Sequence, residues 1–335
     1  MSIFRLLAIF TAFTGAMCAG SVQAATLKIA TESPDGTVWM KMLRKHGKAI
    51  EQRTDGAVKL KFYPGGVMGD SKAVMRKMRV GQLHGAVMTA GGMIQTYPDI
   101  ALYNMPMLFQ SNDEIDHVRA QLDASLMAGL RQNKFVGFGL AEVGFAYPMT
   151  QQPAVSVSQM RGLKVWTPDN DLGSLRAFEA FSIAPIPLPM SDVLAGLQTG
   201  LIDSVAAPPV GTIALQWHTQ VEHALELPLL YIYGLFVMAE KPFEKLTADQ
   251  QLVVSEELRE AVRAADDSAR RDHISAKQAL GNQGIEWRKP SRVELDEWLS
   301  LASQARERLI DSGYVSADLY QQALNLLAEF RGASG

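Results

Sequence analysis

Hydrophobic and polar residues follow two periodicities along this chain of 335 residues. Segments 27–31, 58–63 and 85–89 are short, apolar or alternating runs, which predicts strands. Between them, segments 36–54 and 71–81 carry apolar residues at helical spacing. Strand and helix therefore succeed one another as two β-α-β units, an arrangement that predicts a parallel sheet.

The alternation of helix and strand continues further along the chain and predicts a second α/β lobe. A capping-box pattern, Ser111-x-x-Glu114, predicts that two side chains satisfy free backbone groups at the start of a helix. The expected elements are a helix over 111–132, strands over 135–143, 163–167 and 202–206, and helices over 172–181 and 190–199.

A second capping-box pattern, Thr247-x-x-Gln250, opens the longest helical pattern of the chain. Apolar residues keep helical spacing until Gly281, and a helix of about 35 residues would be about 50 Å long. Because that length exceeds the diameter of one lobe, we expect this helix to run across both lobes. Two more helices are expected to begin near Ser291 and Ser316.

The first residues have the features of an export signal. Arg5 precedes an apolar run over residues 6–13, and Val22-Gln23-Ala24 is a small-x-small cleavage pattern. A membrane anchor is the alternative, but the run is shorter than the roughly 20 apolar residues that a spanning helix needs. We therefore expect residues 1–24 to be a signal peptide that is removed after Ala24 or Ala25.

Cysteine content and charge narrow the function further. Cys18 is the only cysteine, it lies in the expected signal, and the residues before it lack the usual approach to a lipidated cysteine. The mature protein would then have neither a disulfide nor a catalytic thiol. The net charge of −3, without interleaved basic and aromatic residues, predicts no nucleic-acid partner.

The sequence offers few candidates for catalysis. His218 and His223 are five residues apart, which suits neither a pair of metal ligands on a helix nor a zinc motif. Asp169 and Asp171 flank an asparagine, in a setting where turn and N-cap residues are expected. Glycine pairs occur, but none is followed by the Lys-Ser/Thr of a phosphate-binding loop. We predict no catalytic residue, no metal site and no cofactor.

The stretch over residues 160–209 resembles the extracytoplasmic solute receptors of tripartite ATP-independent periplasmic (TRAP) transporters, the DctP-like family. The shared pattern consists of Gly162-Leu-Lys-Val165, Ala184-Pro-Ile-Pro187, Asp192 to Leu197, and Gln198-Thr-Gly200-Leu-Ile-Asp203. Further segments that resemble the family are 43–56, Val58 to Pro64, Val80 to Ala86, Tyr97-Pro98 and Met105 to Phe109. The resemblance therefore covers essentially the whole mature chain.

This resemblance implies an α/β, two-lobed periplasmic solute-binding protein fold, with a cleft between the lobes and a long bridging helix. It implies that lobe I comprises 26–143 plus 232–265, and lobe II 144–231 plus 266–330. A receptor of this kind is periplasmic and is not an enzyme. It binds a small organic solute, closes around it and delivers it to the TRAP permease membrane subunits.

Three polar positions of the family pattern are apolar in this chain. Trp166 stands where an arginine usually follows Lys-Val, and Ala146 stands where an arginine often follows Gly-Phe. Ala207 stands in place of an asparagine. Guanidinium binds a carboxylate through two parallel hydrogen bonds, which no apolar side chain can do. The resemblance therefore indicates a cleft that is more apolar than the family norm.

The expected ligand-binding residues combine these positions with nearby aromatic and glycine residues. They are Trp39, Gly91, Phe145, Ala146, Tyr147, Trp166, Ala207 and Pro208. Because Phe145 and Tyr147 alternate along one strand, both should face the same side.

Alternatives remain open at this point. Trp166 is a core tryptophan in one of them, with the alanines merely filling space. In another the ligand is an organic acid held by a relocated charge from Arg161, Lys164 or Arg176. A periplasmic scaffold or sensor without a transported ligand is the third, and a periplasmic hydrolase is disfavoured because the chain lacks a catalytic triad or metal spacing.

Overall fold

The computed structural model describes residues 24–169 and 172–333. The expected signal peptide up to residue 23, with Cys18, lies outside the described residues, and so does Asp171. Within the described ranges, no helix combines the length and the apolar character that a membrane crossing requires.

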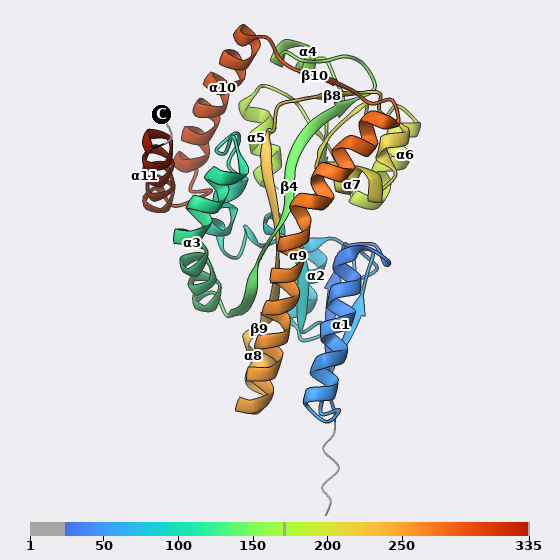
Figure 1. Cartoon of the computed structure of the whole chain (residues 1–335), viewed down its shortest axis with the longest axis vertical. Helices are drawn as coiled ribbons and strands as arrows, with labels where there is room; N and C mark the ends of the chain where they lie inside the picture. Colours follow the sequence, from blue (N-terminus) through green and yellow to red (C-terminus); the bar gives the residue numbers. More distant parts are fainter. Residues whose placement is uncertain (1–23, 170–171, 334–335) are drawn as a thin grey trace, which may run out of the picture.

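The first lobe begins with the two predicted β-α-β units (Figure 1). They comprise β1 (Ala25–Thr31), α1 (Val38–Arg53), β2 (Val58–Tyr63), α2 (Ser71–Arg79) and β3 (Gly85–Thr89). Strand β1 lies between β2 and β3 and is parallel to both, which confirms the predicted parallel arrangement.

Two long strands join the lobes. After η1 (Ala90–Met93), η2 (Pro98–Asn104) and α3 (Asn112–Gln132), strand β4 (Phe135–Thr150) pairs antiparallel with β9 (Leu230–Ala239). The prediction ended β4 at Val143, which is wrong by seven residues because the strand stays buried as it passes into the second lobe. One mixed sheet results, in the order β10-β8-β4-β9-β3-β1-β2, with β7 also paired to β4.

The second lobe is built from short elements. They are α4 (Val157–Arg161), β5 (Trp166–Pro168), α5 (Leu172–Ala180), β6 (Ile186–Leu188), η3 (Met190–Asp192), α6 (Val193–Gln198), β7 (Ser204–Ala207), α7 (Pro209–Ala214), η4 (Trp217–Thr219) and β8 (His223–Leu225). Of these, β5, α5, η3, α6 and β7 lie in segments for which the sequence predicts strands or helices. Strands β5 and β7 begin later than predicted. The expected helix over 190–199 divides into a 3-10 turn and a short α-helix.

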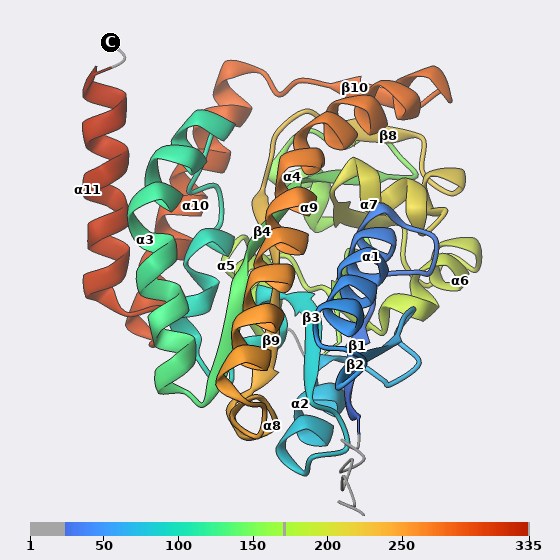
Figure 2. The same ribbon diagram turned by 60° about the horizontal axis from the view of Figure 1, so that its bottom comes forward.

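The last elements include the bridging helix. They are α8 (Glu240–Glu244), α9 (Ala248–Asn282), β10 (Glu286–Arg288), α10 (Arg292–Asp311) and α11 (Ala317–Ala333). Helix α9 has 35 residues and begins with the predicted capping box, in which Thr247 and Gln250 bond each other's backbone N–H. It runs alongside α1 and extends across the upper part of the molecule (Figures 1 and 2). The prediction of a helix that crosses both lobes is confirmed.

The capping box predicted at Ser111 is only half formed. The Ser111 hydroxyl accepts from the Glu114 N–H at 3.2 Å, as expected. The Glu114 carboxylate, however, accepts from the N–H of Gln110 instead of Ser111. It also forms an ion pair of 2.7 Å with Arg331 of α11, which draws this side chain toward the C-terminal helix.

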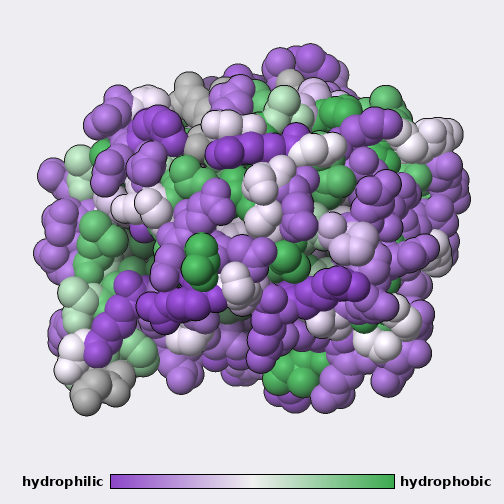
Figure 3. Space-filling model, turned by 90° about the horizontal axis from the view of Figure 1, so that it is seen from above, coloured by the Kyte–Doolittle hydropathy of each residue, from purple (hydrophilic) through white to green (hydrophobic). Residues whose placement is uncertain are grey.

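The two lobes share a hydrophobic core. Its largest cluster includes Met88 of β3, Trp166 of β5 and Leu327 of α11. Helix α11, which was expected in lobe II, packs against α3, which was expected in lobe I. Seen from the lobe II end, the surface is mostly hydrophilic, with separate hydrophobic patches (Figure 3).

Candidate functional site

The sheet changes direction at β1. The chain leaves β1 to form β2 on one side and then crosses to form β3 on the other side. In open α/β sheets, ligands bind outside the carboxyl ends of the strands at such a switch point, because the connections diverge there. The carboxyl ends of β1 and β3 therefore define the first wall of the candidate site.

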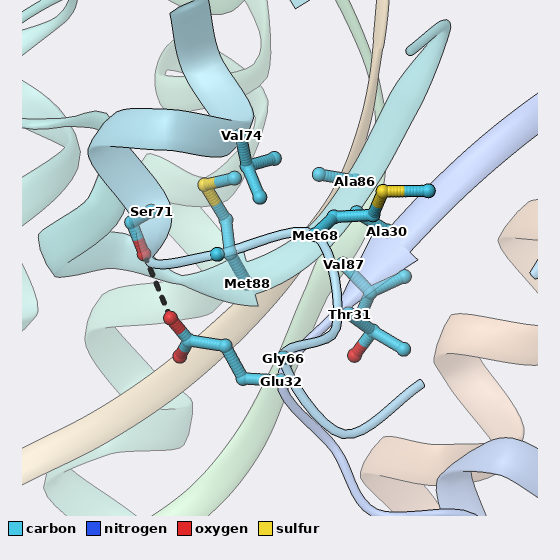
Figure 4. A pocket seen from close by; sticks show the side chains of 11 residues that line it. Ala30, Thr31, Glu32, Gly66, Met68, Ser71, Val74, Ala86, Val87 and Met88 are labelled. Carbon is cyan, nitrogen blue, oxygen red and sulfur yellow. Dashed lines mark hydrogen bonds between the residues drawn. The ribbon is translucent and has the colours of Figure 1, made fainter. Parts of the chain in front are cut away.

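A small pocket of about 10 Å³, room for roughly one water molecule, lies at this edge (Figure 4). Its apolar surface includes Met68, Met88 and Val74, and its polar groups include Glu32 and Ser71. The Ser71 hydroxyl donates to the Glu32 carboxylate at 3.2 Å. We call this the lobe I pocket.

Local structure positions the polar pair. Helix α2 begins at Ser71 because the preceding Asp70 caps it, accepting from the Ala73 N–H at 2.7 Å. Gly92 of η1 lies so close that an added Cβ would be 2.8 Å from both Ser71 Oγ and Met88 Sδ. Only glycine permits this approach, and the neighbouring Gly91, an expected ligand residue, is partly exposed on the same short turn.

In the second lobe, Trp166 is buried at the start of β5, with 4% of its surface exposed. Its indole N–H donates to the Leu188 carbonyl at 3.0 Å. Its ring packs edge-on against Trp217, with the centroids 5.0 Å apart. Since indole has one donor and no acceptor, this side chain offers other groups only ring carbons.

The two alanines of the pattern lie in the same lobe. Ala146 has no exposed surface and Ala207 has 4%. Strand β7 pairs with β4 so that Ala207 lies opposite Tyr147, and the buried Pro208 follows it at the start of α7. We call Trp166, Ala146, Ala207 and Pro208 the lobe II wall.

Phe145 and Tyr147 have rings that other elements cover. Phe145 packs edge-on against Tyr231 of β9, with centroids 5.6 Å apart. Tyr147 packs against His273 of α9 and edge-on against Trp287 of β10. Burial, with the nearby Glu226 carboxylate, raises the pKa of Tyr147 to about 12, so its phenol stays neutral.

The structure brings most of the expected aromatic residues together, but not all. Phe145, Tyr147, Trp166 and Ala207 belong to one buried cluster, which also contains Met88 of the lobe I pocket. Trp39 instead packs against the separate cluster formed by residues of α1, α9 and the adjoining strands.

Sequence reasoning missed the lobe I pocket. Glu32 and Ser71 follow no family pattern that we could recognise, and they lie far apart in sequence. The signal that would have found them is topological, because the segments that follow β1 and β2 meet at the switch point, with Glu32 after β1 and Ser71 at the start of α2.

Two of the charges considered as relocated anchors bind groups of their own lobe. Arg161 donates to the Phe181 carbonyl at 2.9 Å, and Lys164 donates to the Gly200 carbonyl at 2.8 Å. The side chain of Arg176 lies outside the described part of the structure.

The polar residues considered for catalysis lie next to backbone carbonyls or a carboxylate of neighbouring elements, as residues with a structural role do. His218 Nδ1 lies 3.3 Å from the Thr212 carbonyl, and His223 Nδ1 lies 3.4 Å from the Glu286 carboxylate. The Asp169 N–H bonds the Leu188 carbonyl at 3.1 Å. Among residues 24–169 and 172–333, no three His, Cys, Asp or Glu side chains form a group that could hold a metal ion.

Comparison with known proteins gives a consistent result. The family model for bacterial extracellular solute-binding protein, family 7 (DctP) matches residues 29–311. The C4-dicarboxylate-binding periplasmic protein DctP of Rhodobacter capsulatus is 21% identical, over 84% of each chain. The 2,3-diketo-L-gulonate-binding periplasmic protein YiaO of Escherichia coli is 25% identical, over 74% of this chain and 76% of its own length.

A solved structure shows the same fold. It is the sugar acid binding protein DctPAm of Advenella mimigardefordensis in complex with galactonate, with a TM-score of 0.83 and 16% identity. The match covers 91% of this chain and 98% of that one. The likeness therefore extends over both lobes.

Proposed function

This chain belongs to bacterial extracellular solute-binding protein family 7, the DctP family, and on that premise we propose that it binds a largely uncharged organic solute between its lobes. The chain is a periplasmic solute receptor of the TRAP type, and proteins of this type work with membrane permease components. Its own permease, and its delivery of the solute to that permease, are part of the proposal.

The chemistry of the lobe II wall carries the proposal. The single donor of Trp166 is bonded to Leu188, and Ala146 and Ala207 have no polar side-chain atom. The relatives named above bind a diketogulonate, a dicarboxylate and galactonate, all of which are acids. An ionised carboxylate buried against this wall without a charged partner would cost several kcal/mol, on the order of magnitude known for buried ions.

We therefore assign opposite roles to the two walls. An aromatic or alkyl part of the solute would pack on Trp166, where ring contacts stabilise apolar surface without requiring hydrogen bonds. A hydroxyl or amino group would bond to the polar pair in the lobe I pocket, where Ser71 and Glu32 lie.

One structural observation favours a second candidate, an organic-acid receptor with a relocated anchor. Helix α5, which carries Arg176, contacts η1 of the first lobe. Guanidinium binds a carboxylate through two parallel hydrogen bonds, which makes the arginine of this helix the candidate anchor.

A ligand screen separates the two candidates. The mature protein, unfolded and refolded to remove bound molecules, is tested by thermal shift with uncharged aromatic alcohols and with succinate and galactonate. We expect stabilisation by the uncharged compounds, lost in Trp166→Ala. Strong stabilisation by the acids that persists in Trp166→Ala and disappears in Arg176→Gln would refute the apolar site and establish the second candidate.

Native mass spectrometry adds an independent test. Apolar ligands often remain bound during purification, so the mass of a co-purified molecule identifies its class directly. A co-purified sugar acid would contradict the proposal.

A further inference from the structure

The bridging helix α9 is attached to a different lobe at each end. Toward its N-terminus, the Glu257 carboxylate bonds Arg53 and His46 of α1, each at 2.8 Å. Toward its C-terminus, the Lys277 ammonium bonds Glu226 at 2.9 Å and lies 4.6 Å from the centre of the Trp287 ring. If these attachments persist, a rotation of one lobe against the other bends the helix between residues 257 and 277.

Strand β4 is irregular beside this part of α9. Its register with β9 shifts between Glu142 and Gly144, which marks a β-bulge, and bulges bend the strand that contains them. Gly144 has φ +117°, and an added Cβ would lie 2.5 Å from Nδ1 of His273 on α9. The helix and the strand are thus in close contact where the strand is bent.

Charged side chains of α3 and α9 bind the backbone of β4 at the same place. Arg119 of α3 donates to the Leu140 carbonyl at 2.9 Å and to the Asp266 carboxylate at 3.1 Å. Asp266 of α9 in turn accepts from the Glu142 N–H at 2.6 Å. Backbone groups on both sides of residue 141 are therefore held by one arginine–aspartate pair.

A second pair completes the group. The Glu142 side chain, 3% exposed, accepts from Arg270 of α9 at 3.2 Å and from the Tyr231 hydroxyl at 3.3 Å. Arg270 also forms a two-pronged bond to Asp116 of α3, at 2.5 and 2.6 Å. Burial raises the pKa of Glu142 above its ordinary value, although Arg270 opposes this. We call Arg119, Glu142, Asp266 and Arg270 the hinge network.

The network has room to rearrange. It borders a solvent-open hollow of about 250 Å³, lined by Asp116, Glu142, Asp266, Asp267 and Arg270. Hydrogen bonds to charged groups are stronger than those between neutral groups. Breaking a buried ion pair strongly destabilises the folded protein, because it leaves a buried charge without its partner. The group is therefore suited to hold one arrangement of the lobes firmly while remaining able to move as a unit.

We propose that the hinge network is the pivot of the receptor and sets its open–closed equilibrium without touching the solute. Arg119, Asp266 and Arg270 are positioning residues, and the inference depends on the receptor function but not on the class of solute. In this structure the network is intact while η1 of the first lobe contacts α5 of the second. Its bonds therefore stabilise the arrangement in which the lobes touch.

The test measures the distance between the lobes and needs no ligand. A chain that begins at residue 25 contains no cysteine, so two labels can be introduced cleanly. Val67→Cys in lobe I and Leu201→Cys in lobe II change side chains that are 70% and 50% exposed. With nitroxide labels at both positions, pulsed electron paramagnetic resonance gives the populations of the short and long distances.

Asp266→Asn keeps the shape of the side chain but weakens its bonds to Arg119 and to the β4 backbone. We expect the ratio of long to short distances to rise about five-fold or more, as for a typical coupling between states. Asp267→Asn is the matched control, because that neighbouring carboxylate is 57% exposed and pairs with Arg263 at 2.7 Å. It should leave the distances unchanged.

A milder variant covers the case in which Asp266→Asn does not fold. Arg270→Lys keeps the positive charge but loses the two-pronged bond to Asp116, and we expect it to shift the same populations in the same direction. The inference is refuted if a folded hinge variant shows the distances of the parent protein, or if Asp267→Asn shifts them equally. Because no ligand is present, this outcome is independent of the apolar-site proposal.

Discussion

The two walls of the candidate site differ in chemistry and in origin. The lobe I pocket combines methionine and valine side chains with a bonded Ser71–Glu32 pair at the ends of parallel strands. The lobe II wall consists of Trp166, two alanines and a proline, and its one side-chain donor is already bonded to the Leu188 carbonyl.

This difference indicates how binding energy would be divided. An apolar wall attracts any apolar surface of suitable shape, with a gain of roughly 25 cal/mol for each Å² removed from water. A polar pair discriminates instead, because a ligand that does not satisfy its hydrogen bonds leaves polar groups unpaired. We therefore expect affinity to come mainly from lobe II and specificity mainly from lobe I. Substitutions on each side can test that division.

The largest expected effect is in lobe II. Trp166→Ala removes a ring that is 4% exposed and packs edge-on against Trp217. Replacing a buried tryptophan by alanine leaves a cavity, and we expect the free energy of unfolding to fall by about 3–5 kcal/mol. Urea denaturation of the mature protein measures this.

Trp39→Ala in lobe I is the control for this substitution. Trp39 is only partly buried and packs at the margin of the second cluster, so its loss should cost clearly less. If the two variants were equally stable, Trp166 would not be the packing centre of its wall. If Trp166→Ala lost stability but kept full ligand affinity, Trp166 would be a core residue only.

One histidine of α1 and one of the bridging helix α9 give a second contrast. His46 pairs with Glu257 in lobe I at 2.8 Å, whereas neither ring nitrogen of His273 has a hydrogen-bond partner among the described residues. Burial, helped by the nearby Lys277 ammonium, lowers the pKa of His273 from 6.5 to about 4. The folded protein therefore keeps His273 neutral where the unfolded chain would protonate it.

The sign of the pH effect follows directly. The stability contributed by neutral His273 is present above pH 6.5 and is lost as the pH falls toward 4, because the unfolded state gains a proton first. The loss amounts to at most about 3 kcal/mol. His273→Gln should remove this part of the decline in unfolding free energy between pH 7 and pH 4. Equal pH profiles of parent and His273→Gln would contradict the prediction.

The sequence predicts the fold well where local patterns decide it. Segment 85–89 is a strand with the predicted bounds, and the bridging helix begins at the predicted capping box. Strand β4 runs beyond its prediction, because a continuous apolar run does not reveal where a strand passes from one lobe to the next. The half-formed box at Ser111 failed because Arg331, more than 200 residues away, binds the same carboxylate.

The candidate site is less predictable than the fold. Family resemblance predicts the lobe II wall, since its departures fall at recognisable positions. Glu32 and Ser71 come together only because the connection from β2 to β3 through α2 passes the end of β1, and they are 39 residues apart in sequence. Trp39, the second residue of α1, packs against a different cluster because α1 packs against α9, which the local sequence pattern does not reveal.

The smallest expected effect compares two serine–carboxylate bonds. Ser71→Ala removes the 3.2 Å bond to Glu32 in the partly buried lobe I pocket, while Asp70 still caps the helix. Ser191→Ala in lobe II removes a bond of 2.9 Å to the exposed Asp192. Because water replaces an exposed partner but not a buried one, Ser71→Ala should cost about 1 kcal/mol of unfolding free energy, and Ser191→Ala clearly less.

In ligand titrations, Ser71→Ala should weaken the binding of solutes that carry a hydroxyl group more than the binding of matched solutes without one. Equal weakening of both would show that lobe I contributes packing, as lobe II does, and the contrast between the walls would then fail.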